Sequence, residues 1–431
     1  MNDLSLLAIN LTERCNMRCA HCYLDAGQLC NGAANELTTA EVQDILDKIA
    51  GRDWGTMVVL TGGEPLLRKD LEAIISHGAQ KGLAMVVGTN GMALTERRVT
   101  SLKQAGVLGV GISLDSLDEA RHDYFRGLSG GWQRTMAGIE NCRSHDLSFQ
   151  LHFSITEDNA DELPDMIEFA RACGARVLNT FFLVCTGRGE SMSDISPLKY
   201  ERVLSQIIAA QKKNTDLIIR ARCAPHFKRI AHQQNPDSML NRISGMEADG
   251  CIAGTHYCRI TPQGGVTACP YIPDEAGNIR QSDFLEIWDH APDFERLRAP
   301  ELGGKCGMCE YSQLCGGCRA RPVAAGRDLM DEDPFCVYAP QGGKVISPLA
   351  ELDTADVCWS DEAEQRLGRI PFFVRRLVKK RAEAYVAEIG ESVVTPDHLA
   401  TLSARRFGGN GPKIPGYAKG DIRENSQGNH P

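Results

Sequence analysis

The sequence predicts an α/β fold: a partial (β/α)6 barrel, followed by an irregular cysteine-rich domain and a small helical C-terminal domain. Two observations predict the barrel. Six apolar runs rich in β-branched residues recur along the first half of the chain, and helical patterns separate them. The runs are residues 4–11, 57–60, 83–87, 107–114, 149–155 and 177–184. Strands that alternate with helices pair in parallel through right-handed crossovers. Six units are fewer than a closed barrel has, so we expect a partial one.

The helices between these runs are placed by their first residues. Thr38 and Glu41 have the spacing of a capping box, so the first helix begins there. The residues that share its apolar face are Val42, Ile45, Leu46 and Ile49. Near the C-terminus, Ser360 and Thr395-Pro396 are typical of helix starts. They predict helices within residues 359–402.

The length of 431 residues predicts several domains. We divide the chain into a barrel of residues 1–215, a cysteine-rich domain of 216–338, a linker of 339–358, a helical domain of 359–405 and a tail of 406–431. The tail is rich in Gly, Asn and Pro and shows no apolar periodicity, so we expect it to be disordered.

Charge and hydropathy narrow the class of protein. The net charge of −9, from 47 basic and 56 acidic residues, argues against a general role in binding nucleic acid or membrane surfaces. No apolar run approaches the roughly 18 residues that span a bilayer. The first residues lack the basic stretch of a signal peptide. We therefore expect a cytoplasmic protein with no membrane span.

The 17 cysteines are the strongest functional signal, because a chain without an export signal uses them for metal binding rather than for disulfides. Cys15, Cys19 and Cys22 form one group with C-x3-C-x2-C spacing. The second group is Cys251, Cys258, Cys269, Cys306, Cys309, Cys315, Cys318 and Cys336. Those expected to be buried apolar residues are Cys142, Cys173 and Cys185. Those left without a role are Cys30, Cys223 and Cys358.

The first group suits a particular chemistry. Three thiolates can hold three irons of a [4Fe–4S] cluster and leave the fourth iron without a protein ligand. An iron with an open position can bind a small molecule and pass it one electron. Zinc sites and ferredoxins also use such spacings, so the setting matters: the triplet follows the first apolar run directly.

Polar residues follow the other predicted strands where these end. The carboxyl ends of parallel strands meet at one rim, where ligands bind in such sheets. The segments at this rim are Thr61-Gly62-Gly63-Glu64-Pro65, Thr89-Asn90-Gly91, Ser113-Leu114-Asp115-Ser116 and Ser154-Ile155-Thr156. Taken alone, the first is also typical of a β-turn and the third of a helix N-cap. Their convergence on the cysteine loop predicts one binding site.

Cys15-x3-Cys19-x2-Cys22 followed by Gly-Gly-Glu-Pro resembles the radical S-adenosylmethionine (SAM) superfamily, over most of residues 4–190. The resemblance implies a [4Fe–4S] cluster whose open iron binds SAM, and reductive cleavage of SAM to a 5′-deoxyadenosyl radical. It makes the three cysteines the catalytic cluster ligands. The SAM-binding residues that it implies are Gly62, Gly63, Glu64, Pro65, Thr89, Asn90, Ser113, Asp115 and Ser154.

The second cysteine group resembles the SPASM auxiliary-cluster domain of radical SAM enzymes, which implies one or two auxiliary [4Fe–4S] clusters. By this resemblance, the ligands of the nearer cluster are Cys251, Cys258, Cys269 and Cys318. Those of the farther cluster are Cys306, Cys309, Cys315 and Cys336. Cys251 lies just outside the core pattern of the family, so an open iron in the nearer cluster is one possibility. One or two zinc sites with four cysteines are the alternative.

Residues 181–189, 259–262 with 269–271, and 316–321 resemble the heme-forming branch of the SPASM proteins. Residues 359–402 resemble the small C-terminal domain of the dark-operative protochlorophyllide reductase, another tetrapyrrole enzyme. These resemblances imply a porphyrin-type tetrapyrrole whose propionate loses a hydrogen and CO2, as in heme or heme d1 biosynthesis. The partner that they imply is a low-potential electron donor of the flavodoxin or ferredoxin type.

Arg126 and Arg188 follow the fourth and sixth predicted strands and are candidates for binding substrate carboxylates, with a surface ion pair as the alternative. The basic residues of the predicted C-terminal helices are Arg375, Arg376, Lys379, Lys380 and Arg381. They predict either a solvated face or a contact with propionates. Two other functions stay open: a SPASM peptide maturase and a non-catalytic iron–sulfur electron carrier.

Overall fold

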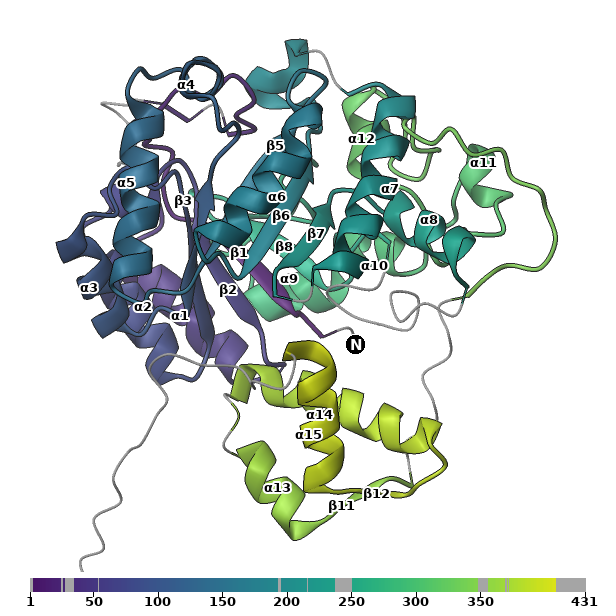
Figure 1. The fold of residues 1–431 in the computed structure, drawn as a ribbon. Coiled ribbons are helices and arrows are strands. Elements are labelled where there is room, and N and C mark those ends of the chain that lie inside the picture. Colours follow the sequence, from purple (N-terminus) through teal and green to yellow (C-terminus); the bar gives the residue numbers. More distant parts are fainter. Residues whose placement is uncertain are drawn as a thin grey trace, which may run out of the picture.

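The computed structural model describes residues 3–24, 26–27, 35–52, 54–192, 195–214, 216–236, 250–347, 356–368, 370 and 372–407. Most of them form one curved sheet with helices on its convex side, and a small helical unit follows (Figure 1). Six strands lie where the sequence predicts them. They are β1 (Leu6–Asn10), β2 (Met57–Thr61), β3 (Ala84–Thr89), β4 (Gly109–Ser113), β5 (Phe149–Ile155) and β6 (Val177–Phe182). They pair in parallel in this order, which confirms the α/β class.

Further strands extend the sheet at both ends. β7 (Ile218–Arg222) pairs in parallel with β6, and β8 (Tyr257–Ile260) pairs in parallel with β1. β9 (Gly265–Thr267) and β10 (Glu275–Asn278) continue beyond β8 as antiparallel strands. In the part of the chain that the structure describes, the order runs from β10 to β7 without closing. The sheet therefore reaches past residue 215, where the sequence-based division ends the barrel.

Helices connect the strands. Those of the barrel are α1 (Thr39–Ala50), α2 (Leu71–Gln80), α3 (Glu96–Ala105), α4 (Glu119–Arg126), α5 (Gly131–Ser144), α6 (Leu163–Ala172), α7 (Pro197–Lys213) and α8 (His226–Gln234). Short 3₁₀ helices are η1 (Pro65–Leu67), η2 (Ala160–Glu162) and η3 (Gly187–Ser191). The irregular cysteine-rich segment contains α9 (Phe284–His290), α10 (Pro292–Arg298), α11 (Gly304–Gly307) and α12 (Ala320–Ala324).

The predicted capping box at the start of α1 is present. Thr38 Oγ1 accepts a hydrogen bond from Glu41 N at 3.2 Å, and the Glu41 carboxylate accepts one from Thr38 N at 2.8 Å. Thr38→Ala is expected to lower the free energy of unfolding by about 1 kcal/mol, because it leaves a helix-end N–H without its acceptor. Urea denaturation measures the change. Thr100→Ala, on the exposed side of α3, is the control and should change it by less than about 0.5 kcal/mol.

The C-terminal unit has a core of its own. It contains β11 (Cys358–Trp359), α13 (Asp361–Gly368), α14 (Phe372–Glu388), β12 (Val393–Val394) and α15 (Pro396–Phe407). Its buried residues are Ala363, Ala382, Val386, Val394 and Leu399. Ser360 Oγ accepts from Ala363 N at 3.2 Å, as the sequence-based helix start requires. The predicted tail lies outside the described residues from position 408 on, and the same holds for the side chains of Arg376 and Lys380.

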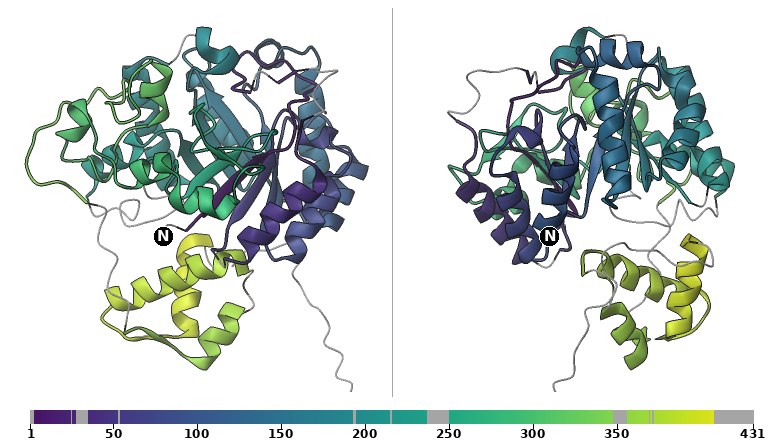
Figure 2. Two further views of the ribbon diagram at one scale, coloured as in Figure 1. Left: turned by 180° about the vertical axis from the view of Figure 1, so that it is seen from behind. Right: turned by 60° about the vertical axis from the view of Figure 1, so that its left-hand side comes forward.

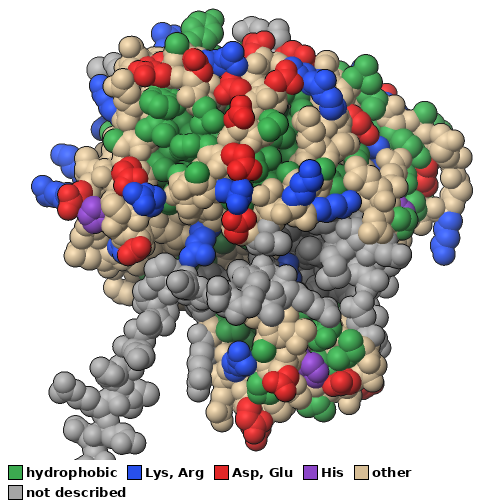
Figure 3. Space-filling view, viewed as in Figure 1, with side chains coloured by type: hydrophobic (Ala, Val, Ile, Leu, Met, Phe, Trp, Pro, Cys, Tyr) green, Lys and Arg blue, Asp and Glu red, His purple; other side chains and the backbone are tan. Residues whose placement is uncertain are grey.

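This unit lies beside the amino ends of the barrel strands in all three ribbon views, whereas the cysteine loop is at the opposite end (Figures 1 and 2). The arrangement favours the interpretation of its basic residues as a solvated face over a contact with substrate at the rim. On the face of the molecule in Figure 3, acidic and basic side chains are interspersed, in keeping with the mixed charges of the sequence. Among the described helices, none is long and apolar enough to cross a membrane.

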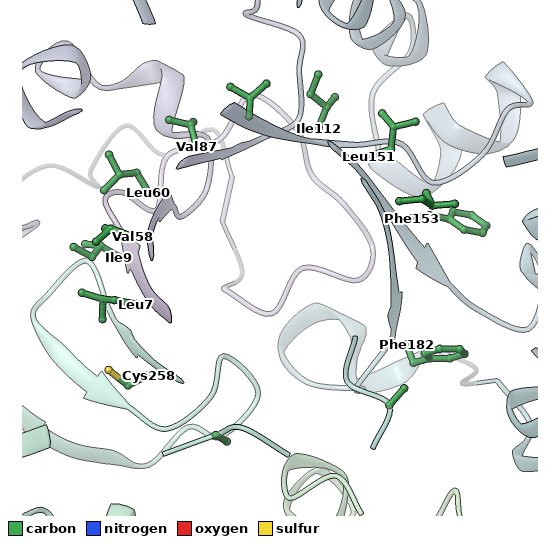
Figure 4. Packing of buried hydrophobic residues seen from close by; sticks show 14 of the residues in the cluster. Leu7, Ile9, Val58, Leu60, Val87, Ile112, Leu151, Phe153, Phe182 and Cys258 are labelled. Carbon is green, nitrogen blue, oxygen red and sulfur yellow. The ribbon is translucent and has the colours of Figure 1, made fainter. Parts of the chain in front are cut away.

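Side chains alternate along each strand, so one set packs under the helices and the other lines the hollow of the sheet. Leu7 and Ile9 of β1 and Phe153 of β5 belong to the first set and have no exposed surface. Figure 4 shows them with Cys258 of β8 on the outer side of the curved sheet. Cys258 is opposite Leu7 in the pairing of β1 with β8 and is fully buried. Its thiol is therefore part of the apolar core.

Candidate active site

The cysteine loop leaves β1 at the rim formed by the carboxyl ends of the strands. Its course is fixed by a hydrogen bond from Cys15 N to Gly27 O at 2.9 Å. Cys19 is buried, and Cys15 and Cys22 are half-buried. Burial raises the pKa of the Cys15 thiol to about 12, so it stays protonated at neutral pH until a metal replaces the proton. The three thiols are sheltered without being sealed from the hollow.

The Gly62–Gly63 turn after β2 packs directly against this loop. Gly63 N donates to Thr12 O at 2.7 Å. A Cβ on Gly62 would lie 2.5 Å from Thr12 O, and one on Gly63 would overlap Arg14 O. Gly62 also has a φ of 131°, which side chains rarely adopt. The two glycines therefore permit the approach that holds the cysteine loop in place.

The Glu64 carboxylate ties this turn to the end of β3. It is fully buried and accepts hydrogen bonds from Leu66 N at 3.1 Å, Thr89 Oγ1 at 2.8 Å and Asn90 N at 2.8 Å. Burial raises the pKa of Glu64 above its ordinary value, and the hydrogen bonds only partly oppose this. Asn90 Nδ2 in turn donates to Asn16 Oδ1 in the cysteine loop at 2.7 Å. These predicted SAM-binding residues thus form a frame behind the loop.

Asp115, which follows β4, forms a buried ion pair with Arg126 at the end of α4. The Nη2–Oδ2 distance is 2.5 Å, and Asp115 Oδ1 accepts from Ser154 N at 2.8 Å. Burial alone would raise the pKa of Asp115, but the positive charge of Arg126 holds it below its ordinary value. Arg126 Nη1 also donates to Cys19 Sγ at 3.7 Å. The pair therefore links the ends of β4 and β5 to a cysteine of the triplet.

Arg188, in η3, holds the same loop from another side. Its Nε donates to Cys19 O at 3.0 Å and its Nη1 to Ala26 O at 2.7 Å. Its backbone N–H donates to Cys22 O at 3.0 Å. The sequence makes Arg126 and Arg188 candidates for binding substrate carboxylates, and in the structure both guanidinium groups contact the cysteine loop. Sequence spacing could not predict these contacts, because Cys19 lies more than a hundred residues before Arg126 and Arg188 in the chain.

The hollow of the sheet presents polar residues next to the rim. One row across β4–β7 is Ser113, His152, Asn179 and Arg220, and the next is Ser154, Phe181 and Arg222. Ser113 and Ser154, both predicted to bind SAM, are half-buried on this face. Arg222 Nε donates to Asn179 Oδ1 at 3.1 Å. Arg220 and Arg222 are not among the predicted site residues, although their alternation with the apolar Ile219 is typical of a strand.

In the cysteine-rich segment, four cysteines surround one cavity. The cysteines that line it are Cys306, Cys309, Cys315 and Cys336. The turn after Cys315 needs Gly316 and Gly317, which have φ values of 62° and 71°. These four are the ligands that the resemblance implies for the farther cluster. Four cysteines are the number that a fully ligated [4Fe–4S] cluster requires.

The other four predicted ligands do not share one location. Burial raises the pKa of the Cys269 thiol, and the nearby thiols of Cys223, Cys251 and Cys318 raise it further. Cys258 lies in the apolar core, because the alternation of β8 turns its side chain to the outer face. The predicted set for the nearer cluster is therefore not brought together at Cys258. Among the residues that the structure describes, no three His, Cys, Asp or Glu side chains are arranged to hold a single metal ion.

Three family models match the chain: "Radical SAM superfamily" over residues 9–170, "Iron-sulfur cluster-binding domain" over 251–319 and "Proto-chlorophyllide reductase 57 kD subunit" over 359–402. The AdoMet-dependent heme synthase of Methanosarcina barkeri is 41% identical over 341 residues, which are 78% of this chain and 97% of that relative. The chain belongs to the radical SAM superfamily. It is thus an enzyme, and the alternative of a non-catalytic electron carrier is wrong.

Other relatives agree with this membership. The AdoMet-dependent heme synthase of Nitratidesulfovibrio vulgaris is 36% identical, with 78% of this chain and 93% of that relative covered. The pre-heme d1 synthase of Dinoroseobacter shibae is 31% identical over 76% of this chain and 86% of its own. The crystal structure of Streptococcus suis SuiB bound to S-adenosylmethionine has a TM-score of 0.64 at 16% identity and covers 78% of each chain. At this identity the likeness shows the fold alone.

The superfamily and its SPASM domain establish the cofactors of this radical SAM enzyme. They are a SAM-binding [4Fe–4S] cluster, SAM itself and auxiliary iron–sulfur chemistry in the cysteine-rich segment. The residues present fit these groups, because three partly or fully buried cysteines share the loop after β1 and four further cysteines line one cavity. Which cysteine binds which cluster is a proposal that rests on this placement.

Proposed function

We propose that this radical SAM enzyme decarboxylates propionate side chains of an iron porphyrin, in a step of heme or heme d1 biosynthesis. The observation that carries the proposal is the 41% identity to the AdoMet-dependent heme synthase of Methanosarcina barkeri over 97% of that relative. The mycofactocin maturase MftC of Mycolicibacterium smegmatis is 29% identical. The alternative of a peptide maturase therefore has weaker support.

The proposed roles follow from the placement of the side chains. Cys15, Cys19 and Cys22 hold the SAM-binding cluster, and Ser113 and Ser154 are positioned to bind hydroxyl or carboxylate groups of SAM. When bound, the cluster and SAM together supply a 5′-deoxyadenosyl radical that takes a hydrogen atom from the substrate. Loss of CO2 then turns the propionate into a vinyl group and releases one electron. An auxiliary iron–sulfur cluster in the cysteine-rich domain would accept this electron.

The concave face offers cations for the carboxylates of such a substrate. Arg220 and Arg222 lie on β7 with their backbones in register with Asn179 and Phe181 of β6. Arginine binds carboxylates through two parallel hydrogen bonds. We propose that Arg222, in the row nearest the carboxyl ends of the strands, binds a porphyrin propionate.

Arg222→Met is expected to raise the KM for iron-coproporphyrin III by about 10- to 100-fold, since a hydrogen bond to a charged group contributes about 1.5–3 kcal/mol. Steady-state kinetics under anaerobic conditions measures it. Arg143→Met removes an arginine from the exposed end of α5 and should leave the KM unchanged. An unchanged KM in Arg222→Met would place the propionates elsewhere.

The function itself is tested by anaerobic incubation of the reconstituted protein with SAM, dithionite and iron-coproporphyrin III. We expect 5′-deoxyadenosine together with porphyrin products that have lost CO2 and two hydrogens, first once and then twice, by mass spectrometry. A variant with Cys15, Cys19 and Cys22 replaced by alanine should form neither. 5′-Deoxyadenosine without any change in the porphyrin would overturn the proposed substrate while leaving the radical SAM chemistry in place.

A further inference from the structure

We propose that Cys223, rather than Cys258, is the fourth ligand of the nearer auxiliary [4Fe–4S] cluster, together with Cys251, Cys269 and Cys318. The proposal completes that cluster with four protein ligands, so it has no open iron. It concerns the iron–sulfur part of the chain and does not depend on the identity of the substrate.

Cys223 is held next to Cys318 by a shared ion pair. Cys223 follows β7 directly, and its carbonyl accepts a hydrogen bond from Arg321. Arg321 Nη1 bonds to Asp333 Oδ2 at 2.9 Å, and the same oxygen accepts from Cys318 N at 2.7 Å. Both charged side chains are almost fully buried. Arg321 and Asp333 thus fix the two cysteines to one another across nearly a hundred residues of sequence.

Cys251 and Cys269 reach the same place from two other segments. Gly250 packs so closely on the carbonyl of Cys315 that a Cβ there would overlap it, which puts Cys251 beside the Cys315–Cys318 turn. Burial raises the pKa of the Cys269 thiol, and the nearby thiols of Cys223, Cys251 and Cys318 raise it further. Four cysteines from four separate segments therefore lie together, partly or fully buried against the core. This is the number that a fully ligated cluster needs.

The backbone at Cys223 gives an independent argument. Its φ is 56°, and among the described residues Asp146 is the other non-glycine with a positive φ. Aspartate tolerates this region because its short polar side chain bonds locally, whereas for cysteine it is unfavourable and glycine is the residue that fits. Unfavourable backbone angles persist where the surroundings fix them, often at functional sites. A cysteine at a position that suits glycine indicates that the thiol is needed.

Cys258 lacks each of these features. Arg259, the next residue on β8, faces the side on which Cys269 lies: it donates to Thr267 Oγ1 at 3.1 Å and to Pro270 O at 3.3 Å, and Thr267 Oγ1 donates to Cys269 O at 3.1 Å. Cys258 faces the opposite side, where it is packed against Leu7 and other buried residues. Burial raises the pKa of the Cys258 thiol, and the charge of Arg298 partly opposes this. A metal ligand at Cys258 would require β8 to turn over within the sheet.

The test uses the full chain with Cys15, Cys19 and Cys22 replaced by alanine, so that only auxiliary clusters contribute. In this background, Cys223→Gly removes the thiol and suits the local backbone. We expect reconstituted protein to lose either one iron or one complete cluster, with a changed EPR spectrum of the reduced protein. Cys258→Val is the matched control, because it keeps an apolar side chain in the core. Its iron and sulfide content and its EPR spectrum should equal those of the background.

Unchanged iron, sulfide and EPR spectrum in Cys223→Gly would overturn the proposal, and so would the same loss in Cys258→Val. Should Cys223→Gly fail to fold, Cys223→Ser tests the same ligand through the EPR signal and the reduction potential. A serine oxygen on the cluster would retain iron but shift the EPR signal and the reduction potential. An unchanged signal and potential in Cys223→Ser would equally count against a ligand at this position.

Discussion

Gly63→Ala is expected to remove most of the iron from the SAM-binding site. A Cβ at this position would overlap the carbonyl of Arg14, which is backbone and cannot swing aside. The cysteine loop or the turn after β2 must therefore shift, although Gly63 N and Glu64 N both donate to the loop. Overpacking of this kind costs about 1–3 kcal/mol. The three thiols would no longer meet one cluster, so SAM cleavage should fall with the iron.

Gly27→Ala is the matched control for this variant. Gly27 pairs with the same residue, Arg14, on the other side of the cysteine loop, and a Cβ there meets no described atom within 4 Å. Iron analysis, the EPR spectrum of the SAM-bound cluster and 5′-deoxyadenosine formation should match the wild type. Full iron loading in Gly63→Ala would show that the close approach of the turn does not fix the loop.

The sheet shows which strands a sequence can predict. β1–β6 are apolar and rich in β-branched residues, and helical patterns separate them, so their positions follow from periodicity. β7 reads Ile-Ile-Arg-Ala-Arg, because one of its faces lines the polar hollow, and its apolar signal is short. β8 lies among cysteines whose spacing predicts metal ligands, and these hide its strand pattern. Both strands take their place in the sheet from long-range pairing with β6 and β1, which no local pattern encodes.

For the site, too, the sequence predicts some features and not others. The triplet and the rim segments could be found from spacing and strand order, because all of them follow strands directly. The roles of individual side chains could not. Asp115 has the residue type of a SAM ligand, and its ion pair with Arg126 in the next helix is not visible in any local pattern. Cys258 and Cys223 have the same side chain and differ only in their positions. Cys258 lies on the outer face of β8, whereas Cys223 follows the end of β7.

The pair of Asp115 and Arg126 is expected to carry the largest single effect on stability. Both side chains are buried, with 0% and 9% exposed. Arg126→Met leaves the Asp115 carboxyl without its cation, and Asp115→Asn leaves Arg126 charged without its anion. Each single change should lower the free energy of unfolding by about 3–5 kcal/mol, as measured by denaturation of the iron-loaded protein. Replacing both residues by apolar ones should restore much of the free energy of unfolding, because no unpaired charge is then left buried.

The same two variants should move the reduction potential of the SAM-binding cluster in opposite directions. Arg126 donates to Cys19 Sγ, and a nearby positive charge stabilises the reduced, more negative cluster. Arg126→Met should therefore lower the potential and Asp115→Asn should raise it, each on the order of tens of millivolts. EPR-monitored redox titration measures both. Mere structural damage would give shifts of the same sign or none, and that result would contradict a role of the pair in setting the potential at Cys19.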